Sequence, residues 1–186
     1  VIFFYDKAPL TAKIGTWAPE KKYTISKIKG EYIELEKPKH KGWRRKLDNK
    51  FTSPFMLDNK QWKTVDHYYY AHHFKSALEL FNFFSLDSGS LLSKDVNLIK
   101  KLIALTKKKK IKEENFIPSI YHGKTLPKPS EINDKQEVLR KALTAKFSIP
   151  EFKHILKLTK KAKLMYFVPR GEPVEATILM KVRENV

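Results

Sequence analysis

The sequence contains no cysteine, and that absence excludes several kinds of chemistry. Disulfide bonds, thiolate metal sites and catalysis by a cysteine nucleophile all need this residue. A chain without cysteine fits a reducing compartment. We therefore expect an intracellular location, either the cytoplasm or, for a chain encoded by a large DNA virus, the virion or the virus factory.

Long apolar runs and clustered glycines are also missing. No apolar stretch approaches the roughly 20 residues that a membrane-spanning helix needs, so no membrane partner is expected. Only six glycines are present, and none forms the G-x-G or G-x-x-x-x-G-K pattern of a phosphate-binding loop. The first residue is Val1 rather than methionine, so we expect the chain to be excised from a longer protein.

Acidic residues are few beside basic ones, with 20 Asp and Glu against 38 Lys and Arg, and the net charge is +18. A charge of this size attracts polyanions, although a solvated lysine-rich surface has the same composition. A basic loop over 37–46 suits DNA or RNA, by phosphate contact and base stacking, through Lys41, Trp43, Arg44 and Arg45. The alternative is a connecting segment with Trp43 packed on the core. The run 107–112 is a second basic segment, whose lysines equally suit the end of a helix.

The residues that are present favour a globular protein of 186 residues, with 41% hydrophobic and 12% aromatic content. That length is most simply one domain. The patterns predict an α+β fold, mostly helical, with a small N-terminal antiparallel β element. Val1–Tyr5 is predicted as a strand, and Tyr23–Ile28 with Tyr32–Glu36 as a hairpin around a glycine turn.

Helical spacing of apolar residues predicts most of the remaining fold. Thr64 is the expected N-cap of one helix and Ser93 of another, and prolines open two later ones. The predicted helices cover Thr64–Phe84, Lys94–Lys107 and Lys135–Phe147, with further ones beginning at Pro150 and Pro173, and Leu164–Val168 is predicted as a strand.

The helix that begins after Thr64 carries an unusual mixture of acid, tyrosine and histidine. At helical spacing Asp66, Tyr70 and His73 share one stripe, which we interpret as one wall of a small-molecule site. The histidines at positions 67, 72 and 73 lack the i, i+4 spacing of a zinc-protease helix, so no metal is expected.

Asp66 and Lys135 are the residues that could supply chemistry. A lysine amine attacks a carbonyl or anomeric carbon once burial or neighbouring charge has lowered its pKa. A nearby carboxylate can then move protons. The alternative for Lys135, in a chain so rich in lysine, is a solvated surface residue.

Several stretches of this chain resemble the NADAR family, also called YbiA-like. That family is typified by L-S-N-F-Y-P-S-P-F followed by V-E-H-Y-Y-Q-A-Q-K-F, and this chain has LDNKFTSPF at 47–55 and VDHYYYAHHF at 65–74. Further along, the family has a lysine four residues before a methionine and then A-x-x-x-K-F. The corresponding residues in this chain are Lys135, Leu139, Ala142, Lys146 and Phe147. A late L-x-x-T and a closing L-M-x-V-R are matched by Leu156–Thr159 and Leu179–Arg183.

The resemblance implies a YbiA-like fold and an N-glycosidase that cleaves ribosyl–nitrogen bonds without a cofactor. Implied ligands are phosphorylated, nucleoside-like intermediates of the riboflavin pathway and ADP-ribose attached to guanine in DNA. Lys135 would form a Schiff base with the opened ribose, and Asp66 would act on protons and ribose hydroxyls. Asn49 would orient the sugar and His67 would brace the site, and Tyr70 and His73 complete the implied substrate-binding set.

This chain also departs from the family pattern. Asp66 replaces a glutamate, Tyr70–His73 replaces Q-A-Q-K, and Pro169–Val174 stands where the family has W-G-x-G. These changes imply an altered substrate or lost catalysis. The alternative function is therefore an inactive module of the same fold that serves as a basic nucleic-acid-binding or interaction protein.

Overall fold

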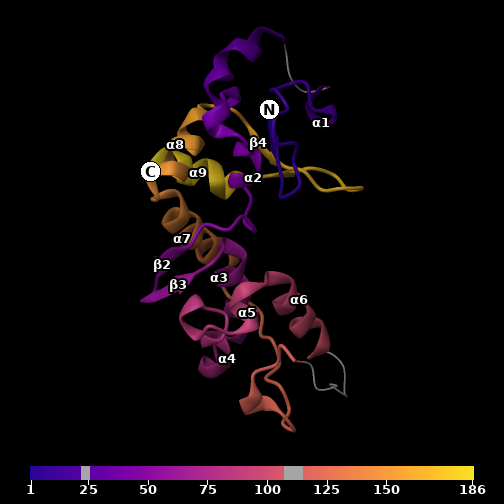
Figure 1. Ribbon diagram of the computed structural model, residues 1–186, viewed down its shortest axis with the longest axis vertical. Coiled ribbons are helices and arrows are strands. Elements are labelled where there is room, and N and C mark those ends of the chain that lie inside the picture. Colours follow the sequence, from indigo (N-terminus) through magenta and orange to yellow (C-terminus); the bar gives the residue numbers. More distant parts are fainter. Residues whose placement is uncertain (22–25, 107–114) are drawn as a thin grey trace. The chain divides into compact units, whose positions relative to one another are not determined.

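Figure 1 traces the computed structural model, which describes residues 1–21, 26–106 and 115–186. The chain divides into two compact units, the first formed by 1–51 with 147–186 and the second by 52–146. Helices dominate both units and short strands accompany them, so the predicted α+β class is confirmed. The expectation of one domain stays a prediction. In the described part of the chain no helix has both the length and the apolar character to cross a bilayer.

A three-stranded sheet lies in the first unit. Strand β1 (Ile2–Phe4) pairs in parallel with β4 (Leu164–Tyr166), and β4 pairs antiparallel with β5 (Val174–Glu175). Every residue of β1 is buried, as expected for a short apolar strand covered on both faces. The predicted strands near 1–5 and 164–168 are thus confirmed, in shorter form.

Helices α8 (Pro150–Leu158) and α9 (Thr177–Asn185) lie side by side in the first unit (Figure 1). Proline stands at the start of α8, as predicted, because its fixed φ suits the first helical turn. The predicted start of the last helix at Pro173 is wrong, since residues 174–175 pair with β4. The guanidinium of Arg183 donates to Thr159 Oγ1 at 2.9 Å, which fastens α9 to the end of α8.

The predicted hairpin of the first unit is wrong. Residues 32–36 lie in the 3₁₀ segment η1 (Ser26–Glu36), which is kinked at Tyr32. Between positions 30 and 36 the buried side chains are Tyr32 and Leu35, and their spacing of three suits a 3₁₀ turn rather than a strand. Of the other predicted strand, Tyr23–Ile28, residues 23–25 lie outside the described residues and the remainder belongs to η1. The remaining short helices here are α1 (Ala18–Lys21), η2 (Pro38–His40) and α2 (Trp43–Lys46).

The second unit opens with a β-hairpin. Strands β2 (Phe55–Leu57) and β3 (Lys60–Trp62) are antiparallel, with Phe55 opposite Trp62. Asp58 and Asn59 form the two-residue turn with φ of 51° and 58°, the left-handed pair that tight hairpins require. The Tyr68 hydroxyl donates to Asp58 Oδ2 at 2.8 Å and fixes this turn to the next helix.

The predicted helix Thr64–Phe84 is interrupted. Helix α3 (Val65–Ala71) passes into the 3₁₀ turn η3 (His72–Phe74), and after a break at Ala77 the chain continues as α4 (Leu78–Asn82). Thr64 is the N-cap, as predicted, because its hydroxyl accepts from the amide of His67.

The second predicted helix is also divided. Ser93 lies inside α5 (Leu91–Lys94), and Asp95 instead caps α6 (Val96–Leu105) by accepting from the amide of Asn97 at 2.8 Å. The lysine run 107–112 lies outside the described residues. Helix α7 (Lys135–Phe147) begins and ends where the sequence predicts. The short turns η4 (Leu86–Ser88) and η5 (Ser119–Tyr121) complete the unit.

Candidate functional site

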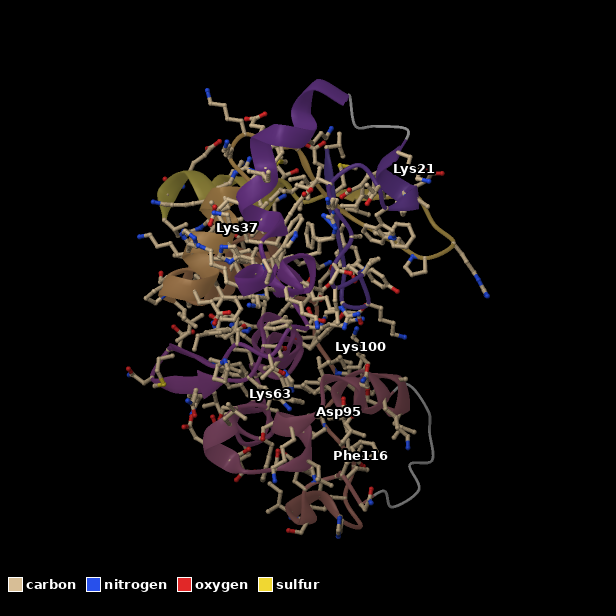
Figure 2. The ribbon with its side chains drawn as sticks, turned by 45° about the horizontal axis from the view of Figure 1, so that its top comes forward. Lys21, Lys37, Lys63, Asp95, Lys100 and Phe116 are labelled. Atoms are coloured by element: carbon tan, nitrogen blue, oxygen red, sulfur yellow. The ribbon has the colours of Figure 1, made fainter. Side chains whose placement is uncertain are left out.

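Asp66 stands in the first turn of α3, and its neighbour in space is a lysine from α6. Helix α6 packs against α3, and Lys100 Nζ lies 3.9 Å from Asp66 Oδ2. The same ammonium lies 5.0 Å from the centre of the Tyr70 ring. Figure 2 labels Lys100 on this helix. Asp66 is 9% exposed, so its carboxylate is largely shielded from solvent.

Tyr70 is the next member of the predicted stripe. Burial, with a further contribution from the Asp66 carboxylate, raises the pKa of Tyr70 to about 12. The phenol is therefore neutral at physiological pH and can donate a hydrogen bond. Its ring stacks on His73, with centroids 6.2 Å apart and planes inclined by 20°. The structure thus brings Asp66, Tyr70 and His73 into one chain of contacts.

His73, just after α3, is hydrogen-bonded to the segment that precedes α7. The amide of Ser130 donates to the carbonyl of His73 at 2.7 Å, and His73 Nδ1 lies 2.8 Å from the carbonyl oxygen of Ser130. The Ser130 hydroxyl adds a third bond, to the His73 carbonyl at 3.1 Å. These bonds join positions 57 residues apart in sequence. They hold the segment that carries Lys135 close to the end of α3.

Lys135 opens α7 and is exposed. Its ammonium donates to Glu131 Oε1 at 2.8 Å, with side-chain exposures of 53% and 81%. This hydrogen bond and the charge of Glu131 raise the pKa of Lys135, and Tyr69 of α3 contributes in the same direction. An attacking lysine must be unprotonated, so Glu131 opposes nucleophilic behaviour in the free protein. Residues 131–136 line a surface depression of about 420 Å³, so Lys135 faces a concave surface.

His67 is enclosed beside the N-cap of α3. It is 1% exposed, and its Nδ1 lies 2.8 Å from Thr64 Oγ1. Its Nε2 is buried with no hydrogen-bond partner among the described residues. Burial, with a smaller contribution from the Lys63 charge and against the opposing charge of Asp95, lowers the pKa of His67 to about 4. Both neighbours are labelled in Figure 2. A neutral, enclosed ring in this position can brace the helix start and has little surface for a ligand.

Asn49 belongs to the first unit and is half-buried in a turn. The side chain of Asp48 shapes this turn by accepting from the amide of Lys50 at 2.7 Å. Its backbone carbonyl also accepts from the amide of Phe51 at 3.2 Å. These two hydrogen bonds fix the turn that carries Asn49.

Three of the four basic-loop residues predicted to contact nucleic acid are packed or hydrogen-bonded within the first unit. Trp43 and Arg44 are 4% and 1% exposed, and Arg44 forms an ion pair with buried Glu20 at 2.8 Å. Arg45 Nε donates to the carbonyl of Ala8 at 2.6 Å, whereas Lys41 is exposed. Trp43 is thus a core residue, packed under the Arg44 guanidinium at 4.3 Å.

Within 1–21, 26–106 and 115–186, no three His, Asp or Glu side chains gather in a way that could hold a metal ion.

The sequence patterns did not indicate Lys100, Tyr69 or Glu131 as site residues. Lys100 follows the buried Ile99 on an amphipathic helix. Its position at the edge of the apolar face is the feature of the sequence that could have indicated a contact with a neighbouring helix. The partner of such a lysine depends on which helix packs there, which no local pattern reveals.

The fold is similar to that of the E. coli protein YbiA, solved by NMR. The two chains share 20% identity over 76% of this chain and 77% of that one, with a TM-score of 0.50. No family model matches the chain, and no curated protein matches it significantly. A likeness at this identity shows the fold, so the expected YbiA-like fold is confirmed, and membership of the NADAR family stays a prediction.

Proposed function

We propose that this chain is an N-glycosidase that hydrolyses a ribosyl–nitrogen bond in an ADP-ribosylated base or a phosphorylated nucleoside-like compound. The observation that carries the proposal is the His73–Ser130 contact, which holds the segment leading to Lys135 against the helix of Asp66 and Tyr70. The YbiA-like fold and the residue resemblance support it.

Lys135 is the nucleophile of the proposed reaction. Its neutral amine attacks C1′ of the ribose, and the bond from C1′ to the base nitrogen breaks while the base takes up a proton. Loss of the amine proton and opening of the sugar ring give an imine between lysine and ribose. One water molecule then hydrolyses the imine, which releases the sugar with its 5′ substituent intact, as ADP-ribose or a ribose phosphate, and restores the amine. Asp66 carries protons between these steps.

Tyr70 and Lys100 assist in different ways. The neutral phenol of Tyr70 donates to a ribose hydroxyl or a phosphate oxygen. The ammonium of Lys100, held between Asp66 and the Tyr70 ring, attracts the negative charge of a phosphorylated substrate. Both side chains come from elements of the second unit, as does Lys135.

Glu131 must release Lys135 before the reaction begins. The pair is exposed, and ion pairs of this kind are weak because water screens them. A substrate that enters the depression at 131–136 replaces Glu131 as the neighbour of the amine. Without the carboxylate of Glu131 beside it, the pKa of Lys135 falls and the amine loses its proton more readily.

The experiment is borohydride trapping with two substrates, an oligonucleotide with ADP-ribosylated guanine and a phosphorylated riboflavin intermediate. The expected result is release of ADP-ribose or of a ribose phosphate, and a reduced adduct that peptide mass spectrometry places on Lys135. Lys135→Ala abolishes both, whereas Lys141→Ala, on the exposed side of the same helix, preserves them. Equal release by Lys135→Ala and by the unaltered protein would refute the proposal.

A second candidate function is a binding module that retains the fold without the chemistry. The observation that favours it is the ion pair between Lys135 and Glu131, which keeps the amine protonated, together with a net charge of +18. It predicts no trapped adduct with either substrate and association with polyanions that weakens steeply as salt rises. Adduct formation on Lys135 would exclude it.

A further inference from the structure

Three aromatic side chains of the first unit gather at the ends of different elements. Tyr5 follows β1, Trp17 precedes α1 and Phe167 follows β4. The Tyr5 and Trp17 rings are stacked, with centroids 6.3 Å apart and planes inclined by 10°. Phe167 meets both rings edge-on, at 5.4 Å from Tyr5 and 5.3 Å from Trp17. We call these three residues the aromatic cluster.

The aromatic cluster differs from the core in its exposure. All three rings are partly exposed, whereas the other two tryptophans, Trp43 and Trp62, are 4% and 0% exposed. The guanidinium of buried Arg44 lies over the Trp17 ring, 5.7 Å from its centre, and helps to hold the stack in place. Aromatic side chains that hold one another in place and remain partly exposed are suited to stacking with a planar ligand.

Each residue of the aromatic cluster has an exposed lysine or arginine within four positions in the sequence. Lys7 follows Tyr5 by two residues, Lys13 and Lys21 flank Trp17 by four, and Arg170 follows Phe167 by three. All of these cations are exposed, and a separation of four residues spans at most about 14 Å. Within the described residues none of them is in an ion pair.

The nearby acids neutralise little of this charge. Glu20 is buried and paired with Arg44, and Asp6 is paired with Lys50 at 3.2 Å. Glu172 remains as an exposed carboxylate in the loop of Arg170. The local charge around the aromatic cluster therefore stays positive, in agreement with the net charge of the chain.

We propose that the aromatic cluster is a binding site for single-stranded nucleic acid. Bases stack on Trp17, Tyr5 and Phe167 while the surrounding lysines and Arg170 contact phosphates, a combination that serves single strands of any sequence. An acidic protein segment would satisfy the cations but would leave the ring faces without a flat partner. The inference does not depend on the glycosidase proposal, since its residues all belong to the first unit.

The first test needs no variant. Trp43 and Trp62 are buried, so quenching of tryptophan fluorescence by a ligand reports on Trp17. We expect a dT oligonucleotide of about ten nucleotides to quench it. An abasic oligonucleotide of the same length and a polyglutamate of equal charge should leave it unchanged. Equal quenching by all three would mean that charge alone acts, which overturns the proposal.

The second test uses variants and the anisotropy of a labelled dT oligonucleotide. Trp17→Leu should weaken binding about tenfold, the effect of losing one stacked base. The matched control is Tyr121→Leu, a partly exposed tyrosine of the second unit, which should bind like the unaltered protein. Circular dichroism verifies folding, and Phe167→Leu repeats the test if Trp17→Leu does not fold. Unchanged affinity in a folded variant contradicts the proposal.

The third test separates local from general charge. Replacing Lys7, Lys21 and Arg170 with glutamine should reduce the slope of log affinity against log salt by about two, since each phosphate contact on a single strand contributes about 0.7. The control replaces Lys75, Lys124 and Lys128, which are exposed residues of the second unit. Equal loss in both triple variants would show that the aromatic cluster has no special part in binding.

Discussion

Glu131 Oε1 accepts a hydrogen bond from Lys135 Nζ at 2.8 Å, and the pair sets the protonation of the proposed nucleophile. The pKa of Lys135 is raised by this hydrogen bond and by the carboxylate charge, and the same contact lowers the pKa of Glu131. Because the amine reacts only when neutral, the pair makes the free protein a poor nucleophile below the raised pKa.

Glu131→Gln should therefore increase the rate of adduct formation at neutral pH. The glutamine has no charge to hold the lysine proton, so the pKa of Lys135 falls and the rising limb of the pH–rate profile moves to lower pH. The measurement is single-turnover trapping from pH 6 to pH 10. Glu137→Gln is the control, because Glu137 pairs with Arg140 on the same helix. A profile of Glu131→Gln that coincides with that of the unaltered protein would argue against Lys135 as the reacting amine.

Lys100 should matter only for substrates that carry phosphate. Its ammonium lies 3.9 Å from Asp66 and over the Tyr70 ring, where it can bind a negative group. Lys100→Gln should raise KM for a phosphorylated substrate about tenfold, the scale of one charged hydrogen bond, and leave KM for the dephosphorylated compound unchanged. Lys101→Gln is the neighbouring control, since Lys101 lies over the Phe116 ring at 5.0 Å instead; Figure 2 labels Phe116. An equal effect on both substrates would assign Lys100 a structural role.

The sequence was sufficient where local chemistry decides the structure. Thr64 caps α3 because a hydroxyl there satisfies a free amide, and α7 begins at Lys135 directly after the Ser130–Asp134 segment. It was insufficient at Tyr32–Glu36, where alternation suggested a strand, because burial of Tyr32 and Leu35 favours a 3₁₀ turn. The Lys100–Asp66 and His73–Ser130 contacts depend on tertiary packing between distant segments, which periodicity does not encode.

The buried ring of His67 should make folding stability depend on pH. Burial lowers its pKa from 6.5 to about 4, so between these values the unfolded chain binds a proton that the folded chain does not. The stability contributed by the neutral ring is complete above pH 6.5 and is lost as pH falls towards 4, by about 3 kcal/mol. His67→Gln should flatten the curve of unfolding free energy against pH in this window.

Urea denaturation at several pH values measures this effect. The burial-lowered pKa values of His40 and His72 contribute in the same direction and persist in the variant, so the difference between the two proteins isolates His67. His122→Gln, at an exposed position, is the control and should reproduce the original slope. A slope as steep in His67→Gln as in the unaltered protein would contradict the lowered pKa.

Glu20 and Arg44 form a buried ion pair whose two members should respond differently to mutation. Glu20 also accepts from the amides of Phe3 and Gly15, each at 2.9 Å. Glu20→Gln leaves the guanidinium charge buried without a partner and replaces one acceptor oxygen by a donor, so we expect a loss of about 3–5 kcal/mol in unfolding free energy. Because the pKa of Glu20 is raised in the folded protein, the unaltered protein gains stability from this carboxyl as pH falls, whereas glutamine does not titrate, so the loss should be larger at pH 5 than at pH 8.

The loss of unfolding free energy caused by Arg44→Met should instead be smaller at low pH. Burial already raises the pKa of Glu20 despite the nearby guanidinium, and removing Arg44 raises it further. The carboxyl then takes up a proton at pH 5 and is buried neutral, whereas at pH 8 it remains an unpaired buried charge. Urea denaturation of both variants at both pH values, each compared with the unaltered protein, should show losses that change in opposite directions between pH 8 and pH 5. If Arg44→Met instead keeps its stability and weakens nucleic-acid binding, Arg44 acts at the surface and not as the partner of Glu20.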